Sequence, residues 1–192
     1  GYREFYEGNT ADMIVDCMNR TEGLITKEDL KNYTAIERIP IEFEYRGYKV
    51  YSMPPASSGG VTIAGILNQL ENIELGELEY HSAQHIHYVS EAERRVYADR
   101  AEFMGDMDFV PVPLAKLSSD EYAAQRWKSV DSLNATASID VSHGNIPFDY
   151  NESEETTHYS VVDKWGNAVS VTTTVNGWYG NGIVVDGAGF LL

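Results

Sequence analysis

The sequence contains little cysteine, few basic residues and no long apolar stretch. Its single cysteine, Cys17, excludes an intrachain disulfide and a zinc site made of several cysteines. Lysine and arginine number 14 against 30 aspartates and glutamates, which gives a formal charge of −16. This charge argues against nucleic-acid binding, which needs a basic surface, and against docking on anionic membranes. No apolar run approaches the about 18 residues of a membrane-spanning helix, so we expect no membrane contact from this segment.

The remaining composition is that of a globular protein. The 192 residues, 43% apolar and 23% charged, suffice for about one domain with its own core. His81 and His85 stand four residues apart, but no acidic or cysteine ligand is placed to complete a metal site. We therefore expect neither a metal nor another cofactor. Because the sequence starts at Gly1 and ends on apolar residues, we also expect it to be an internal piece of a longer chain.

Hydrophobic periodicity predicts a mostly helical first part. The predicted helices span 10–19, 27–33, 61–71, 82–104 and 119–130, and a β-hairpin spans 41–52. Residues 53–60 and 105–117 are rich in breakers and are predicted to be irregular. Residues 131–155 are polar with little periodicity, so we expect an exposed and mobile segment there.

The pattern changes to strands after residue 155. Residues 158–162 and 168–175 predict a hairpin, and 183–185 a further strand. If the turn is centred on Trp165, Val162 faces Ala168 and Thr156 faces Thr174 on one side of the hairpin. A plain alternative is that these threonines are present because threonine favours strands.

The position of Thr156 adds a chemical possibility. A threonine hydroxyl is a weak nucleophile unless a base lies beside it, and its own α-amine can serve as that base at neutral pH. Such an amine exists only if the chain is cut between Glu155 and Thr156. The polar segment that ends at Glu155 would suit such a cut.

Several stretches resemble the γ-glutamyltranspeptidase family, in the order that the family has them. Residues 155–163 and 166–169, with the sequences ETTHYSVVD and GNAV, resemble its processing site and first small-subunit strand. Residues 53–60, MPPASSGG, match its Pro-Pro-Ser-Ser-Gly-Gly stretch, with Ala56 as a departure. Further matches are GLITKEDL at 23–30, Glu91-Ala92, YADR at 97–100 and Gly105-Asp106.

The resemblance implies an α+β fold that is part of an αββα N-terminal-nucleophile hydrolase sandwich. In this fold a helical part precedes the hairpin. It also implies self-cleavage between Glu155 and Thr156, after which Thr156 attacks γ-glutamyl amides such as glutathione and passes the acyl group to water or an amino acid or peptide. By matching the family's motif, Thr174 would hydrogen-bond the nucleophile and Asn176 would contact substrate. Thr157 is the rival nucleophile, on the opposite face of the strand.

By the same resemblance, residues 1–155 would end the large subunit and residues 156–192 would begin the small subunit, the two pairing after cleavage. A periplasmic or extracellular location is implied. Because the family's substrate-binding arginine and oxyanion donors fall outside this sequence, we expect this piece alone to be inactive and its unpaired strand edges to favour self-association. Two alternatives stay open: a catalytically inactive structural or binding member, and a related acylase acting on poly-γ-glutamate or β-lactam side chains.

Overall fold

The computed structural model describes residues 1–146, 157–173 and 178–192, and divides the chain into two compact units. One unit comprises Gly1–Glu37 with Glu154–Leu192, and the other comprises Arg38–Ser153. In the described part of the chain, no helix combines the length and apolarity needed to cross a membrane.

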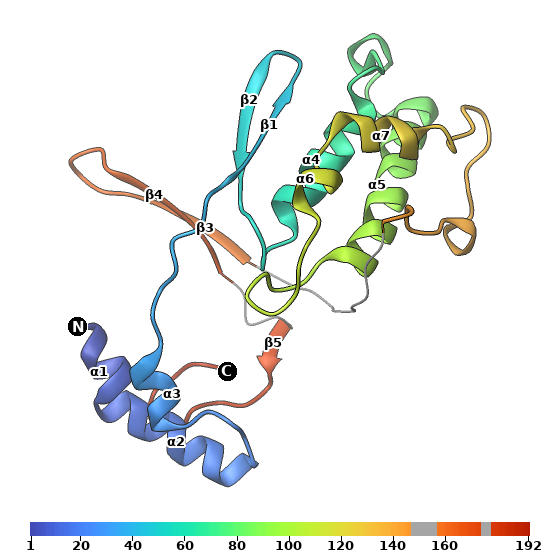
Figure 1. The fold of residues 1–192 in the computed structure, drawn as a ribbon. Helices are drawn as coiled ribbons and strands as arrows, with labels where there is room; N and C mark the ends of the chain where they lie inside the picture. Colours follow the sequence, from blue (N-terminus) through green and yellow to red (C-terminus); the bar gives the residue numbers. More distant parts are fainter. Residues whose placement is uncertain (147–156, 174–177) are drawn as a thin grey trace. The chain divides into compact units, whose positions relative to one another are not determined.

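The first unit combines three helices with the C-terminal strands (Figure 1). Its elements are α1 (Tyr2–Glu7), α2 (Asn9–Thr21), α3 (Lys27–Asn32), β3 (Thr157–Val162), β4 (Ala168–Thr173) and β5 (Trp178–Asn181). A capping box begins α3, because the Thr26 hydroxyl and the Asp29 carboxylate each accept from the other's backbone N–H. A small core joins the two ends of the sequence, since Val185 packs with Ile14 and Cys17 of α2.

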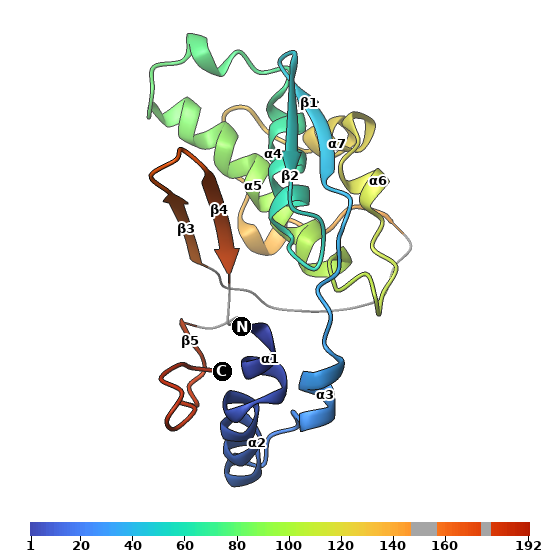
Figure 2. The same cartoon turned by 90° about the vertical axis from the view of Figure 1, so that its left-hand side faces the viewer.

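The second unit is built around α4 (Figure 2). Its elements are β1 (Ile41–Tyr45), β2 (Tyr48–Ser52), α4 (Gly59–Leu70), α5 (Ala83–Phe103), α6 (Leu114–Leu117), α7 (Asp120–Trp127) and the 3₁₀ turns Leu75–Glu77 and Ser138–Asp140. Helices α5 and α7 and the β1–β2 hairpin all pack on α4. The shared core is apolar and consists of Ile41, Phe43, Val61, Ala64, Phe103, Met104, Leu117 and Tyr122.

The structure confirms the α+β class, with a helical part followed by a hairpin, and three of the local expectations are wrong. Gly59 and Gly60 are helical, although the run of breakers predicted irregular chain. Residues 114–117 form a helical turn. Residues 183–185 make only a single bridge, between Val184 and Leu191, and the last strand is β5 instead. Three consecutive β-branched residues suit a strand. The Ile183 carbonyl accepts from the Leu192 N–H and the Val185 N–H donates to the Phe190 carbonyl, but the pairing does not extend beyond this one bridge.

Gly60 lies in the first turn of α4, against the backbone of the residues that precede the helix. A Cβ on Gly60 would lie 2.2 Å from the Met53 carbonyl oxygen, whereas one on Gly59 would meet only the Ser57 hydroxyl at 3.4 Å. We predict that Gly60→Ala in the whole protein lowers the free energy of unfolding by about 1–3 kcal/mol, because backbone must shift. The matched variant Gly59→Ala should be neutral or slightly stabilising. Equal urea midpoints for the two variants would contradict this packing.

Candidate functional site

The β3–β4 hairpin contains the strand that begins directly after Thr156 (Figure 2). The two strands are antiparallel, and their paired residues run from Val162 with Ala168 at the turn to Thr157 with Thr173 at the open end. Every pair of numbers sums to 330, which is the register predicted from the turn. The register of the hairpin is therefore confirmed across all six described pairs.

The turn fixes this register by local hydrogen bonds. The Asp163 carboxylate accepts from the backbone N–H groups of Trp165 and Asn167, both at 2.9 Å, and from the Asn167 side-chain amide at 2.8 Å. These bonds, led by that of the Asn167 side chain, lower the pKa of Asp163. Gly166 takes a φ of +87°, a conformation that side chains with a Cβ rarely adopt. The sequence DKWGN therefore closes the hairpin at a defined residue, which sets every pair behind it.

The sequence-predicted site residues Glu155, Thr156, Thr174 and Asn176 lie outside the described residues. The described backbone reaches Thr157 on β3 and Thr173 on β4, one residue short of Thr156 and Thr174. The roles of these four residues thus stay predictions. The same holds for the proposed subunit boundary after residue 155.

Two other family-like stretches lie on helix α5, where they supply buried carboxylates. Glu91 is fully buried and accepts from Arg95 Nη1 at 2.6 Å, and Arg94 also pairs with it. The same carboxylate accepts from Thr136, from its backbone N–H at 2.9 Å and its hydroxyl at 2.7 Å. Arg95, 2% exposed, in turn donates to the Ser129 hydroxyl and carbonyl, both at 2.8 Å. Glu91 and Arg95 thereby fasten the chain that follows α7.

The protonation of Glu91 is tied to folding. Burial alone would raise the pKa of Glu91, but hydrogen bonds from Thr136 and Arg95 outweigh it and lower the pKa to about 2. Because the folded pKa lies below the unfolded value, the stabilisation is complete above about pH 4.5 and is lost as the pH falls toward 2.

We compare the free energy of unfolding of the wild type with that of Glu91→Gln. We predict that the difference in favour of the wild type falls by about 3 kcal/mol as the pH is lowered from 6 to 2. Urea unfolding of both proteins along a pH series measures it. A difference that stays constant across this range would contradict the buried, hydrogen-bonded carboxylate.

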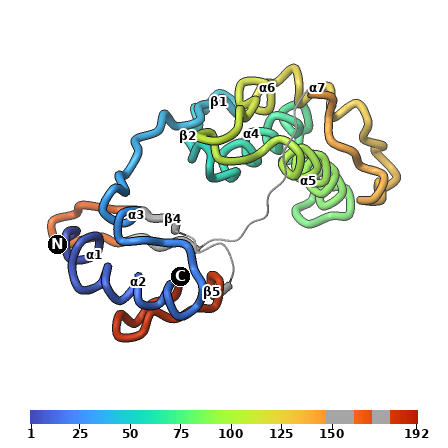
Figure 3. The backbone as a smooth tube through the Cα atoms, turned by 60° about the horizontal axis from the view of Figure 1, so that its bottom comes forward, coloured from blue at the N-terminus to red at the C-terminus, as the bar shows by residue number. Residues whose placement is uncertain are grey.

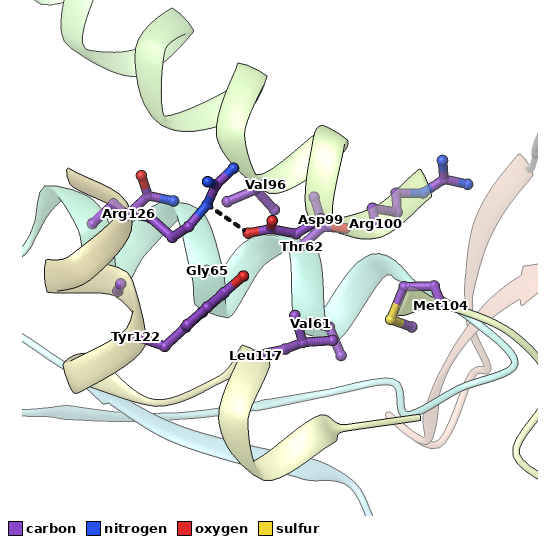
Figure 4. Close-up of a pocket in the computed structure, with 12 residues that line it drawn as sticks. Val61, Thr62, Gly65, Val96, Asp99, Arg100, Met104, Leu117, Tyr122 and Arg126 are labelled. Carbon is purple, nitrogen blue, oxygen red and sulfur yellow. Dashed lines mark ion pairs between the residues drawn. The ribbon is translucent and has the colours of Figure 1, made fainter. Parts of the chain in front are cut away.

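The second carboxylate, Asp99, joins three segments of the unit (Figure 4). It forms an ion pair with Arg126 of α7, with Nε and Oδ2 at 3.0 Å, and accepts from the Gly144 N–H at 2.6 Å. Burial raises the pKa of Asp99 despite these partners. Burial and the Asp99 charge also raise the pKa of the neighbouring Tyr122. Asp99 and Arg126 therefore form a buried ion pair, and the Gly144 backbone N–H donates to it.

The space beside this pair is too small for a substrate. The cavity between α4, α5 and α7 measures about 10 Å³, near the lower bound for one water molecule. The Asp99–Arg126 pair therefore holds segments in place, and the cavity beside it offers no room for a γ-glutamyl compound. In the part of the chain that the structure describes, no three His, Cys, Asp or Glu side chains are grouped to hold a metal ion.

Sequence reasoning noted Glu91 and the YADR stretch only as matches and missed their partners. The four-residue spacing of Glu91 and Arg95 is a visible helical pairing signal. Nothing local indicates that Arg126 meets Asp99, or that Thr136 meets Glu91, because these contacts join residues 27 and 45 positions apart.

Comparison with known proteins places the whole sequence in one family. A family model described as gamma-glutamyltranspeptidase matches residues 1–192. The chain is 49% identical to the glutathione hydrolase proenzyme of Escherichia coli (strain K12), over 100% of this chain and 33% of that protein. It is also 37% identical to the acylase ACY 1 proenzyme of Pseudomonas sp. (strain SE83), over 97% of this chain and 32% of that protein. The chain thus spans about a third of the length of the curated relatives it matches.

Solved structures agree. The Helicobacter pylori gamma-glutamyltranspeptidase is 42% identical with a TM-score of 0.72, covering 75% of this chain and 41% of that one. The cephalosporin acylase of Bacillus halodurans is 26% identical with a TM-score of 0.75, covering 99% of this chain and 32% of that one. With a family match over every residue, the chain belongs to the γ-glutamyltranspeptidase family.

Proposed function

We propose that the whole protein hydrolyses or transfers γ-glutamyl groups, with Thr156 as a nucleophile that self-cleavage creates. The observation that carries the proposal is the family match over all 192 residues, which includes the Glu155-Thr156 junction. Glutathione is the first substrate to test, since the relatives at 49% and 47% identity are glutathione hydrolase proenzymes.

The cleavage step balances without a cofactor. The Thr156 hydroxyl oxygen attacks the Glu155 carbonyl carbon, the C–N bond breaks, and the hydroxyl proton passes to the departing α-amine. Water then hydrolyses the resulting ester, which leaves a carboxylate on Glu155 and restores the hydroxyl of Thr156. The products are a chain ending at Glu155 and a chain beginning with a free amine on Thr156, which act as the large and small subunits.

The freed amine then serves catalysis as a base. It takes the Thr156 hydroxyl proton as the oxygen attacks the γ-carbonyl of the substrate, and it returns a proton to the departing amine. An acyl ester remains on Thr156, and water or the amine of an amino acid or peptide receives the γ-glutamyl group. We assign Thr174 to hydrogen-bond the nucleophile and Asn176 to contact the substrate.

The hairpin register supports the pairing of Thr156 with Thr174. The described strands pair without interruption up to Thr157 and Thr173, and the next pair in that register is Thr156 with Thr174. Antiparallel neighbours on one face bring hydroxyl groups within reach of each other. A one-residue change of register would put Thr174 opposite another residue. A periplasmic or extracellular location and exposed strand edges that favour self-association of the isolated piece belong to the same proposal.

A second candidate is an acylase acting on other amide side chains. It is favoured by the 37% identity to the acylase ACY 1 proenzyme and by the likeness to the cephalosporin acylase. The proposed nucleophile and its activation are the same, so the substrate alone separates the two. The third alternative, a catalytically inactive structural member, is separated by the absence of any turnover.

Substrate profiling of the whole protein tests this proposal. We expect hydrolysis of a γ-glutamyl anilide to exceed that of an acyl β-lactam by at least about tenfold in kcat/KM, and an added dipeptide to accept the acyl group. The uncut Thr156→Ala protein is the matched control. Preference for the acyl β-lactam would favour the acylase, and no turnover of either would favour the inactive member.

A further inference from the structure

Helix α2 packs against a segment that lies far from it in the sequence, residues 183–192 (Figure 3). The Cys17 thiol of α2 donates to the Val184 carbonyl at 3.6 Å, although the two residues are 167 positions apart. In front of α2, the Phe5 ring of α1 stacks on the Phe190 ring with centroids 5.9 Å apart. Both sides of this contact belong to the same compact unit.

The contact encloses an apolar core to which both sides contribute. On α2, the side chains of Ile14 and Cys17 are buried in it. Of the side chains that the structure describes in 161–169 and 179–192, only that of Val185 is buried, and it lies in this core. The other members are Met13, Met18, Leu30, Ile183, Ala188, Phe190 and Leu192. Separating the two sides would expose this apolar surface to water, which is unfavourable.

The C-terminal segment is shaped for this contact by its own backbone. The Val185 N–H donates to the Phe190 carbonyl at 3.0 Å, and the Ala188 N–H donates to the Val185 carbonyl at 3.1 Å. Gly187, in the turn between them, takes a φ of +82°, which favours glycine. A Cβ on Gly187 would lie 3.3 Å from the end of the Met13 side chain, so the turn itself lies close against α2. Bonds within the segment therefore hold its apolar side chains toward the helix.

We propose that this contact is part of the interface that holds the two chains together after self-cleavage, with α2 on the large subunit and residues 183–192 on the small subunit. The inference rests on the proposed function, in which the chain is cut between Glu155 and Thr156. Before the cut, the contact joins two parts of one chain. After the cut, the same residues form a contact between two chains, and Val185 is the buried side chain that the small subunit supplies.

An ion pair at the edge of this contact contributes less than the core. Arg20 and Asp186 approach to 3.0 Å, but their side chains are 55% and 75% exposed. Water and salt screen the charges of such exposed pairs, so these pairs add little to association. We therefore expect the burial of Val185 to supply more of the stability of the contact than this ion pair does.

Labelling of Cys17 tests the contact locally, because its buried thiol reacts only when the two sides separate. The cleaved whole protein is treated with iodoacetamide without denaturant, and the Cys17 peptide is quantified by mass spectrometry. Val185→Ala removes both methyl groups from a side chain that is 0% exposed, so labelling should be at least about tenfold faster. The matched control is Val184→Ala, whose side chain is 53% exposed, and it should label within about twofold of wild type.

A second measurement shows whether the contact lies between chains. Sedimentation in a urea series follows the separation of the two chains of the cleaved protein, and the midpoint should fall on dilution. Val185→Ala should lower this midpoint at every protein concentration, whereas Val184→Ala should leave it unchanged. In the uncut Thr156→Ala protein the two sides stay covalently joined, so Val185→Ala should lower an unfolding midpoint that does not depend on concentration.

The possible outcomes separate this inference from the proposed function. Equal labelling of Cys17 in Val185→Ala and Val184→Ala would overturn the inference. So would a cleaved protein whose chains separate at the same urea concentration with and without Val185→Ala. A wild-type precursor that is never cut would instead overturn the proposed function, and the labelling contrast would then mark a contact within one chain.

Discussion

Replacing Thr156 with alanine in the whole protein will leave a single uncut chain that does not turn over γ-glutamyl amides. The variant lacks the hydroxyl that attacks the Glu155 carbonyl, so the ester cannot form and the α-amine stays locked in a peptide bond. The same lost oxygen is the nucleophile for substrate, so the turnover rate should fall by roughly 10³-fold or more. Denaturing electrophoresis measures the cut, and release of an aniline from a γ-glutamyl anilide measures turnover.

Two further variants show whether the effect is specific to the hydroxyl of this residue. Thr156→Ser keeps a hydroxyl and should still be cut, with reduced activity. Thr157→Ala removes the neighbouring hydroxyl, whose residue pairs with Thr173 within the described hairpin, and should be cut normally. A Thr156→Ala protein that is cut, or that remains active, would exclude Thr156 as the nucleophile, and loss of cleavage in Thr157→Ala alone would transfer the role to Thr157.

Replacing Arg95 with methionine will cause the largest loss of stability. The side chain of Arg95 is 2% exposed. Its removal leaves the fully buried Glu91 without its i,i+4 partner at 2.6 Å, and Ser129 without the two bonds that Arg95 donates to its hydroxyl and carbonyl. Breaking a buried ion pair by removing one partner typically costs 3–5 kcal/mol, and we expect about that loss here. Urea unfolding of the whole protein measures it.

The same helix offers a matched control. Arg94 pairs with the same carboxylate, but its side chain is 30% exposed, so Arg94→Met should cost only about 0–1 kcal/mol. The double variant with leucine at both 91 and 95 should recover part of the loss, because no buried charge is left unpaired. Similar losses for Arg94→Met and Arg95→Met would show that the Glu91–Arg95 pair is not the buried element described here.

The sequence predicts most local structure, because the signals for it are local. The Thr26 capping box, the Ser82 cap of α5 and the Asp163–Gly166 turn each depend on residues within a few positions of one another. The turn is the most informative, because its length fixes the strand register six pairs away. The helical start at Gly59 and Gly60 is missed because the close packing of Gly60 against the Met53 backbone outweighs the low helix propensity of glycine.

The contacts that α5 makes with the chain after α7 could not be predicted from local sequence pattern. The segment from 131 has no periodicity, and its mobility stays a prediction, yet Thr136 and Gly144 both bond buried carboxylates. These partners are chosen by tertiary packing and leave no periodic trace in the sequence. At the candidate site, chemical reasoning leads from the Glu155-Thr156 junction to a possible nucleophile, and the roles of Thr174 and Asn176 come from the family resemblance.

The most direct measurement is the intact mass and N-terminal sequence of the whole protein after purification in active form. The proposal predicts two chains, and the smaller one begins Thr-Thr-His-Tyr-Ser, with Thr156 as its first residue. An active protein that remains one chain, or whose second chain begins elsewhere, would contradict it.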